Sequence, residues 1–138
     1  MSHLHLDYLS NKGYTIAYNS SGNCIIENAK GSDYNDLLYG NEYNNTIHGS
    51  KGGDYIWGLE GNDKLFGEDG HDNIKGGKGD DRLSGGDGND EIEGGIGDDK
   101  LYGGNGNDDI EGGEGDDIFI ASGTGSNELI GGSGIDKL

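Results

Sequence analysis

The sequence contains no proline, no valine and a single cysteine, Cys24, among its 138 residues. One cysteine excludes an intramolecular disulfide, a thiolate metal cluster and a Cys-x-x-Cys redox motif. Leu, Ile and Phe together number 26, less than a fifth of the chain. So few core-forming residues, combined with a formal net charge of -18, are typical of a disordered chain. Composition alone therefore predicts no fold.

Positive charge is also scarce, with 9 Lys and Arg against 27 Asp and Glu. Nucleic acids and anionic membrane surfaces would repel such a chain, so we expect cations rather than nucleic acid as partners. No apolar stretch approaches membrane-spanning length, and the start, MSHLHLDYLSNKGYTIAY, lacks the basic patch and apolar run of a secretory signal. We therefore expect no membrane span, and any export must use another route.

The glycines and the remaining apolar residues are arranged in a nine-residue repeat. An apolar residue recurs every nine positions, with one extra residue before the last two: Leu38, Ile47, Ile56, Leu65, Ile74, Leu83, Ile92, Leu101, Ile110, Phe119, Leu129 and Leu138. Two residues before each stands an Asp or an Asn: Asp36, Asn45, Asp54, Asp63, Asp72, Asp81, Asp90, Asp99, Asp108, Asp117, Asn127 and Asp136. With glycines at fixed places, as in GGKGDD (76–81) and GGDGND (85–90), the consensus is G-G-x-G-x-D-x-U-x, where U is apolar.

The apolar residue alternates between Ile and Leu from Ile56 to Ile110, so the chemical period is eighteen residues. We therefore predict an all-β solenoid in which two nonapeptides complete one coil. The three residues x-U-x are expected to form a short strand of about 10 Å. The six glycine-rich residues reverse the chain, often with positive φ. The Ile and Leu rows then face each other and form the whole core.

Stacked coils would place each Asp about 4.8 Å from the Asp eighteen residues later. At that distance two carboxylates repel by about 0.9 kcal/mol even in bulk water. A calcium ion takes oxygen ligands at about 2.3 to 2.6 Å and would span about 4.6 to 5.2 Å between coils, whereas magnesium is too small and zinc lacks its usual ligands. Because two rows of apolar residues bury little surface, we expect calcium binding to drive folding and the calcium-free chain to be disordered.

The sequence from Gly49 to Asp117 resembles eight uninterrupted repeats of the repeats-in-toxin (RTX) family, and residues 27–48 resemble the degenerate repeats that precede such arrays. The resemblance implies a right-handed parallel β-roll with calcium between turns. It also implies that each ion lies between turn n and turn n+2, held by both Asp side chains and by carbonyls of the first four turn positions. Further implications are transit through a type I secretion machinery, a secreted, extracellular bacterial location, and folding at the exit, where calcium is available.

The resemblance assigns calcium ligands residue by residue. The side-chain ligands are Asp54, Asp63, Asp72, Asp81, Asp90, Asp99, Asp108 and Asp117, with weaker sites at Asp36 and Asp136. The backbone carbonyl ligands are Gly49, Ser50, Lys51, Gly52, Gly58, Leu59, Glu60, Gly61, Gly67, Glu68, Asp69, Gly70, Gly76, Gly77, Lys78, Gly79, Gly85, Gly86, Asp87, Gly88, Gly94, Gly95, Ile96, Gly97, Gly103, Gly104, Asn105, Gly106, Gly112, Gly113, Glu114 and Gly115.

These ligands form two columns of turns, one through Asp54 and one through Asp63, and three gaps in each column give about six ions. A further ion between the turns of Asp117 and Asp136 fits the same pattern. Asn127, and Tyr34 and Tyr43 at glycine positions, weaken the other terminal sites. We therefore expect six to eight ions, and six of them would reduce the net charge from -18 to about -6.

Four segments follow from the repeat pattern. Residues 1–30 are expected to form strands that cap the first coil, 31–48 are degenerate leading repeats, 49–120 are the regular calcium-binding repeats, and 121–138 are degenerate C-terminal repeats. The last repeat stops at Leu138, so we expect the chain to be part of a larger protein. Trp57, Phe66 and Tyr102 flank buried positions and are expected on the outer faces of strands.

Other interpretations fit less well. A flexible acidic linker needs no nine-residue phase, an EF-hand would require glycine where Ile92 stands in 87–94, and an ice-binding solenoid would require a ladder of Thr. No H-E-x-x-H, G-x-S-x-G, G-x-x-x-x-G-K-[ST] or G-x-G-x-x-G motif occurs, so we expect no enzyme. We expect a monomeric folding module of a secreted toxin. The alternatives are the C-terminal part of a secreted protease or lipase, or a repeat of a giant adhesin.

Overall fold

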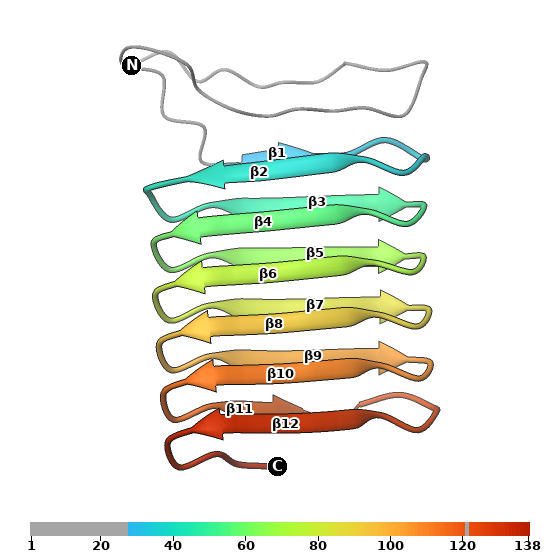
Figure 1. Ribbon diagram of the computed structural model, residues 1–138. Helices are drawn as coiled ribbons and strands as arrows, with labels where there is room; N and C mark the ends of the chain where they lie inside the picture. Colours follow the sequence, from blue (N-terminus) through green and yellow to red (C-terminus); the bar gives the residue numbers. More distant parts are fainter. Residues whose placement is uncertain (1–27, 121) are drawn as a thin grey trace.

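A computed structural model describes residues 28–120 and 122–138, which form strands and tight turns only. Each strand from β2 to β12 carries one apolar repeat position, and short turns connect successive strands (Figure 1). The strands are β1 (Asn28–Lys30), β2 (Leu37–Asn41), β3 (Thr46–Lys51), β4 (Tyr55–Glu60), β5 (Lys64–Asp69), β6 (Asn73–Lys78), β7 (Arg82–Asp87), β8 (Glu91–Ile96), β9 (Lys100–Asn105), β10 (Asp109–Glu114), β11 (Ile118–Ile120) and β12 (Glu128–Ser133).

Successive strands alternate between two parallel sheets, so that each coil contributes one strand to each sheet. The orders are β1-β3-β5-β7-β9-β11 and β12-β10-β8-β6-β4-β2. Residues eighteen apart pair in register, as Leu65 does with Leu83 and Ile74 with Ile92. Figure 1 shows the coils stacked one upon another along a single axis. The predicted all-β parallel solenoid with two nonapeptides per coil is confirmed.

The core consists of two rows of apolar side chains that face each other between the sheets. Because side chains alternate across a strand, the repeat position U points inward and its two neighbours point outward. All ten buried apolar residues of the described chain are repeat positions, and none is more than 4% exposed. They are Leu38, Ile56, Ile74, Ile92 and Ile110 in one sheet, and Ile47, Leu65, Leu83, Leu101 and Phe119 in the other.

The outward positions pair across adjacent coils. The rings of Tyr39 and Trp57 lie 5.6 Å apart, and Arg82 lies over the Tyr102 ring at 4.6 Å. His48 stacks on Phe66 with ring centroids 4.7 Å apart. Cross-strand pairs of this kind each contribute about 0.2 to 1 kcal/mol. The prediction that Trp57, Phe66 and Tyr102 lie outside the core is confirmed.

The strands are longer than predicted. β3 to β10 and β12 each span six residues instead of three, because the first turn residues also pair with their equivalents in the neighbouring coil. The ladder is interrupted at the first glycine of the turn. In β4 and β6, Trp57 pairs with Lys75 and Leu59 with Gly77, while Gly58 is not a ladder residue. The chain therefore reverses over the last three turn residues, and the first glycine of the turn makes no ladder pair with the neighbouring coil.

The ends of the described chain follow the same pattern, apart from one extra residue in the C-terminal repeats. The extra residue of the C-terminal repeats falls between Ile120, eighteen residues after its partner Tyr102, and Gly123, nineteen residues after Gly104. Beyond it β12 pairs with β10 in the usual way. At the other end β1 pairs with β3. Of the predicted capping segment 1–30, residues 28–30 form β1, and residues 1–27 lie outside the described residues.

The core rows generate a direct prediction. Leu83→Ala is expected to lower the free energy of unfolding of the calcium-saturated chain by about 2 to 5 kcal/mol, because the rigid ladders on both sides limit collapse into the cavity. Chemical denaturation in saturating calcium measures this loss. Ser84→Ala, at the next outward position, is the matched control and should change stability by less than about 0.5 kcal/mol. Equal effects of the two substitutions would contradict the two-row core.

Candidate metal-binding turns

The last Asp of each turn belongs to a ladder of hydrogen bonds that runs along the solenoid. We number turn positions 1 to 6, from the first glycine to this Asp. The backbone N–H of Asp54 donates to Asp72 Oδ1 at 2.8 Å, and that of Asp72 donates to Asp90 Oδ1 at 2.9 Å. The second column repeats this from Asp63 to Asp81 and from Asp81 to Asp99, both at 2.7 Å. One oxygen of each carboxylate is thus fixed by the preceding coil, as the predicted columns require.

The other carboxylate oxygen of the same residues is buried without a hydrogen-bond partner. This holds for the Oδ2 atoms of Asp54, Asp63, Asp72, Asp81, Asp90, Asp99, Asp108 and Asp117, the eight residues predicted as main side-chain ligands. Each of the eight residues is at most 3% exposed. A buried anionic oxygen without a partner costs several kcal/mol unless a cation neutralises it. The eight atoms are therefore the candidate side-chain ligands for a cation.

A carbonyl oxygen from the next coil along the chain, two turns further on, approaches each of seven of these atoms. A Cβ placed on Gly76 would lie closer than 3.0 Å to both Asp81 Oδ2 and the Gly94 carbonyl oxygen, so the two oxygens converge on one point. The seven converging pairs are Asp54 with Gly67, Asp63 with Gly76, Asp72 with Gly85, Asp81 with Gly94, Asp90 with Gly103, Asp99 with Gly112, and Asp117 with Gly131. Oxygens of turn n and turn n+2 therefore meet beside the glycine at position 1.

Glycine has two separate roles in these turns. At position 1 the φ angle is not positive, and glycine is required because any Cβ would occupy the space between the converging oxygens. At positions 2 and 4 the backbone is left-handed, as at Gly77 (φ 119°) and Gly79 (φ 127°). Ser50, Leu59 and Glu68 adopt the same conformation at position 2 at some cost in strain. The sequence analysis predicted the second role and missed the first.

The carbonyls at positions 2 to 4 stay predicted ligands. At position 3 they accept a backbone hydrogen bond from the preceding coil, as the Ile96 carbonyl does from Gly79 N–H at 2.8 Å. A carbonyl oxygen has a second lone pair, so this bond leaves one site for a metal ion. No three His, Cys, Asp or Glu side chains gather into a metal cluster among the described residues. The donors are carbonyl oxygens and single carboxylates, a set that suits calcium and not zinc.

A second, outer ladder was not predicted. At position 5 the side chain accepts the N–H of the equivalent residue in the next coil, as from Asp98 to Asp80 Oδ1 at 3.1 Å and from Asp80 to Asn62 Oδ1 at 3.1 Å. These side chains are exposed, and an Asn accepts as well as an Asp. The pattern of Asp, Asn and His at position 5 was visible in the sequence, but only stacked coils bring donor and acceptor together.

Burial raises the pKa of seven ladder carboxyls in the metal-free coil: Asp54, Asp63, Asp72, Asp81, Asp90, Asp99 and Asp117. The pKa reaches about 7 in Asp54, Asp81 and Asp99, and about 6 in Asp63 and Asp90, mainly through desolvation. The backbone hydrogen bond from the preceding coil lowers each pKa, while neighbouring carboxylates raise most of them further. Burial and like charge therefore both oppose ionised, metal-free ladders.

The terminal turns differ from the regular ones. Asp108 Oδ2 faces Asn127, whose Oδ1 accepts the Asp108 N–H at 3.0 Å, and Asp136 is only half-buried. In the first turn Asp36 Oδ2 accepts two hydrogen bonds from Ser32. The sequence analysis identified Asn127 as weakening a site but missed Ser32. An S-x-x-x-D pattern was the available signal.

The raised pKa values predict that a calcium-free sample gains β structure when the pH is lowered from about 8 to about 5. The pKa of these carboxyls rises from an ordinary value of 3.8 to about 6 or about 7 in the folded coil, so folding takes up protons. The cost of burying ionised carboxylates is full above these folded values and is lost as pH falls through them. Circular dichroism in chelator measures the change.

The matched variant for this experiment is Asp81→Asn combined with Asp99→Asn, which removes two titrating groups and keeps the Oδ1 atoms that accept the N–H groups of Asp63 and Asp81. Its pH dependence should be shallower than that of the original chain. A calcium-free spectrum that is unchanged by acidification, or that loses β signal, would contradict the burial of these carboxylates.

A family model described as an RTX calcium-binding nonapeptide repeat (4 copies) matches residues 30–65, 57–92, 66–101, 84–119 and 121–138. No curated protein and no solved structure matches the chain. Repeats of this family bind calcium and are typical of bacterial proteins secreted by the type I route. The matched segments span well over half of the sequence and include every converging turn. The chain therefore belongs to the RTX calcium-binding nonapeptide repeat family.

Proposed function

We propose that this chain is a calcium-dependent folding module of a larger secreted bacterial toxin. It is disordered where calcium is scarce, crosses the envelope unfolded by the type I route, and folds outside the cell. The observation that carries the proposal is the set of buried Asp Oδ2 atoms without hydrogen-bond partners, seven of which face a carbonyl oxygen of another coil. The module has no catalytic role, and its partners are calcium ions and, in transit, the secretion machinery.

The seven converging pairs support a complement of seven calcium ions, within the predicted range of six to eight. Each ion would be held by the Asp Oδ2 and the position 1 carbonyl that converge beside a glycine, with further carbonyls of the same turns completing the shell. Seven divalent ions add 14 positive charges to a formal net charge of -18 and leave about -4. Binding thus removes most of the repulsion that favours an expanded chain.

In this proposal, the difference in calcium concentration between the cytosol and the outside of the cell decides whether the module folds. Extracellular calcium modules bind with dissociation constants of about 10⁻⁴ to 10⁻³ M, so such turns are empty in a calcium-poor cytosol and filled outside. Because the core is only two rows of side chains, the metal-free coil has little to offset its buried, unpaired carboxylates.

The described residues contain no helix of the length and apolarity needed to cross a membrane.

The proposed switch predicts a cooperative change from disorder to β structure when calcium is titrated to about 10 mM into the chelator-treated chain. Far-ultraviolet circular dichroism measures it. Magnesium is the control and should produce no comparable transition, because it prefers shorter bonds and retains its waters. A β spectrum that is the same with chelator and with calcium would overturn the proposal.

A matched pair of neighbouring substitutions tests the ladder itself. Asp81→Asn removes an unpaired buried Oδ2, so we expect it to raise the calcium concentration at the folding midpoint and to lower the number of bound ions by at least one. Asp80→Asn removes the same charge from an exposed side chain that needs only an acceptor oxygen. Its midpoint should stay close to that of the original chain. Equal shifts would show that overall charge, and not the buried ladder, controls folding.

A further inference from the structure

The turns of the first coil, 31–36 and 40–45, differ from all later turns of the described chain in backbone and in hydrogen bonding. We infer that they bind no calcium and instead close the ends of both ion columns with their own side chains. The inference rests on the calcium binding proposed above, and it concerns which turns at the start of the solenoid bind no calcium. It reassigns Asp36, predicted as a weaker ligand, to a structural role.

In turn 31–36 the oxygen that would face an ion already has two donors. Ser32 N–H donates to Asp36 Oδ2 at 2.6 Å, and the Ser32 hydroxyl donates to the same atom at 2.8 Å. The Ser32 hydroxyl oxygen in turn accepts the Tyr34 N–H at 3.2 Å. The Gly49 carbonyl lies beside Asp36 Oδ2 as its equivalents do in later turns, but a cation there would face the positive end of the Ser32 N–H dipole.

Turn 40–45 repeats this arrangement with different residues. Asn41 N–H donates to Asn45 Oδ1 at 2.8 Å, and Asn45 Nδ2 donates to Asn41 Oδ1 at 3.3 Å. Asn41 Oδ1 also accepts the Tyr43 N–H at 2.8 Å. Two turns of different composition thus each make three hydrogen bonds among positions 2, 4 and 6. Ser and Asn favour such turns because their side chains accept hydrogen bonds from nearby backbone N–H groups.

The backbone explains why the later turns cannot do this. From Ser50 and Gly52 onward, both position 2 and position 4 of each turn have positive φ. The first two turns have neither. Their position 4 is Tyr34 or Tyr43, and a left-handed backbone is costly for a bulky residue. With ordinary φ at position 2, its N–H reaches the position 6 side chain, whereas in the regular turns Oδ2 stays free of donors.

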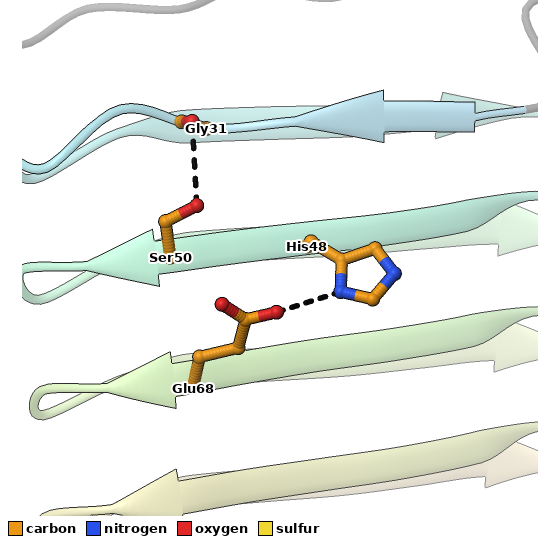
Figure 2. Close-up of polar contacts among 4 residues, drawn as sticks. All are labelled: Gly31, His48, Ser50 and Glu68. Carbon is orange, nitrogen blue, oxygen red and sulfur yellow. Dashed lines mark hydrogen bonds and ion pairs between the residues drawn. The ribbon is translucent and has the colours of Figure 1, made fainter.

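Contacts between the first two coils also use side chains. Figure 2 shows the Ser50 side chain directed at Gly31, whose carbonyl oxygen accepts its hydroxyl in a long hydrogen bond of 3.4 Å. Gly31 is at position 1, where the carbonyls of later turns converge on an Asp Oδ2. In the same view His48 pairs with Glu68 of the following coil at 2.7 Å. A first coil that binds no calcium therefore ends both ion columns with turns whose side chains are hydrogen-bonded within the coil.

The test counts bound calcium by native mass spectrometry in two matched variants of the full chain. Asp36→Asn should bind as many ions as the original chain, because an amide oxygen can still accept from Ser32. Asp54→Asn, one coil further along the same column, should bind at least one ion fewer, because it removes an unpaired buried Oδ2. Loss of an ion from both variants would overturn the inference.

A second variant tests the other turn without removing any ligand. Asn45→Asp restores the consensus residue, yet the Asn41 N–H still points at its side chain, so the ion count should not change. A gain of one ion would overturn the inference for this turn. Circular dichroism of the same calcium-loaded samples confirms that each variant is folded. If the original chain itself retains no calcium, the proposed function fails, whereas ion loss on Asp36→Asn leaves that function intact and removes only this inference.

Discussion

The packing of buried carboxylates along one axis is the constraint on which the rest of this structure depends. Each coil adds two Asp side chains that are fixed through Oδ1 by the preceding coil, while Oδ2 stays buried and unpaired in the regular turns. The stack that forms the core and the sheets therefore also brings like charges together. A cation with many oxygen ligands, such as calcium, removes this opposition. The proposed dependence of folding on calcium follows from it, because two rows of apolar side chains do little to offset the buried charges.

The glycine pattern follows from the same constraint. A site between coils needs carbonyl oxygens that leave the strand ladder and approach a carboxylate, and the ladder is interrupted at position 1 for that reason. Any side chain at Gly76 or its equivalents would fill the site. Positions 2 and 4 need glycine for the different reason that the backbone is left-handed there. The lack of space for a side chain at position 1 and the left-handed backbone at positions 2 and 4 both require glycine. In the sequence the two requirements together look like a general enrichment in glycine.

A one-dimensional stack of this kind must also end. The first coil ends it with ordinary backbone angles and Ser, Asn and Tyr in place of the glycines, so that its turns satisfy themselves by hydrogen bonding. At the other end Asn127 enters the ladder after the extra residue, and Asp136 is only half-buried. The ends are thus chemically different from the middle, although their strands pair in the same register.

The sequence alone predicts the eighteen-residue coil, the two core rows, the two Asp columns and the choice of calcium. The first three follow from periodicity, because residues eighteen apart must stack once the coil closes, and the choice of calcium follows from oxygen ligands at that spacing. The sequence did not determine the six-residue strands, the outer ladder at position 5, the spatial role of the first glycine, or the closure of the first coil by Ser32 and Asn41. Those features depend on the direction of individual N–H and C=O groups, which φ at positions 2 and 4 controls and which only stacked coils bring within bonding distance.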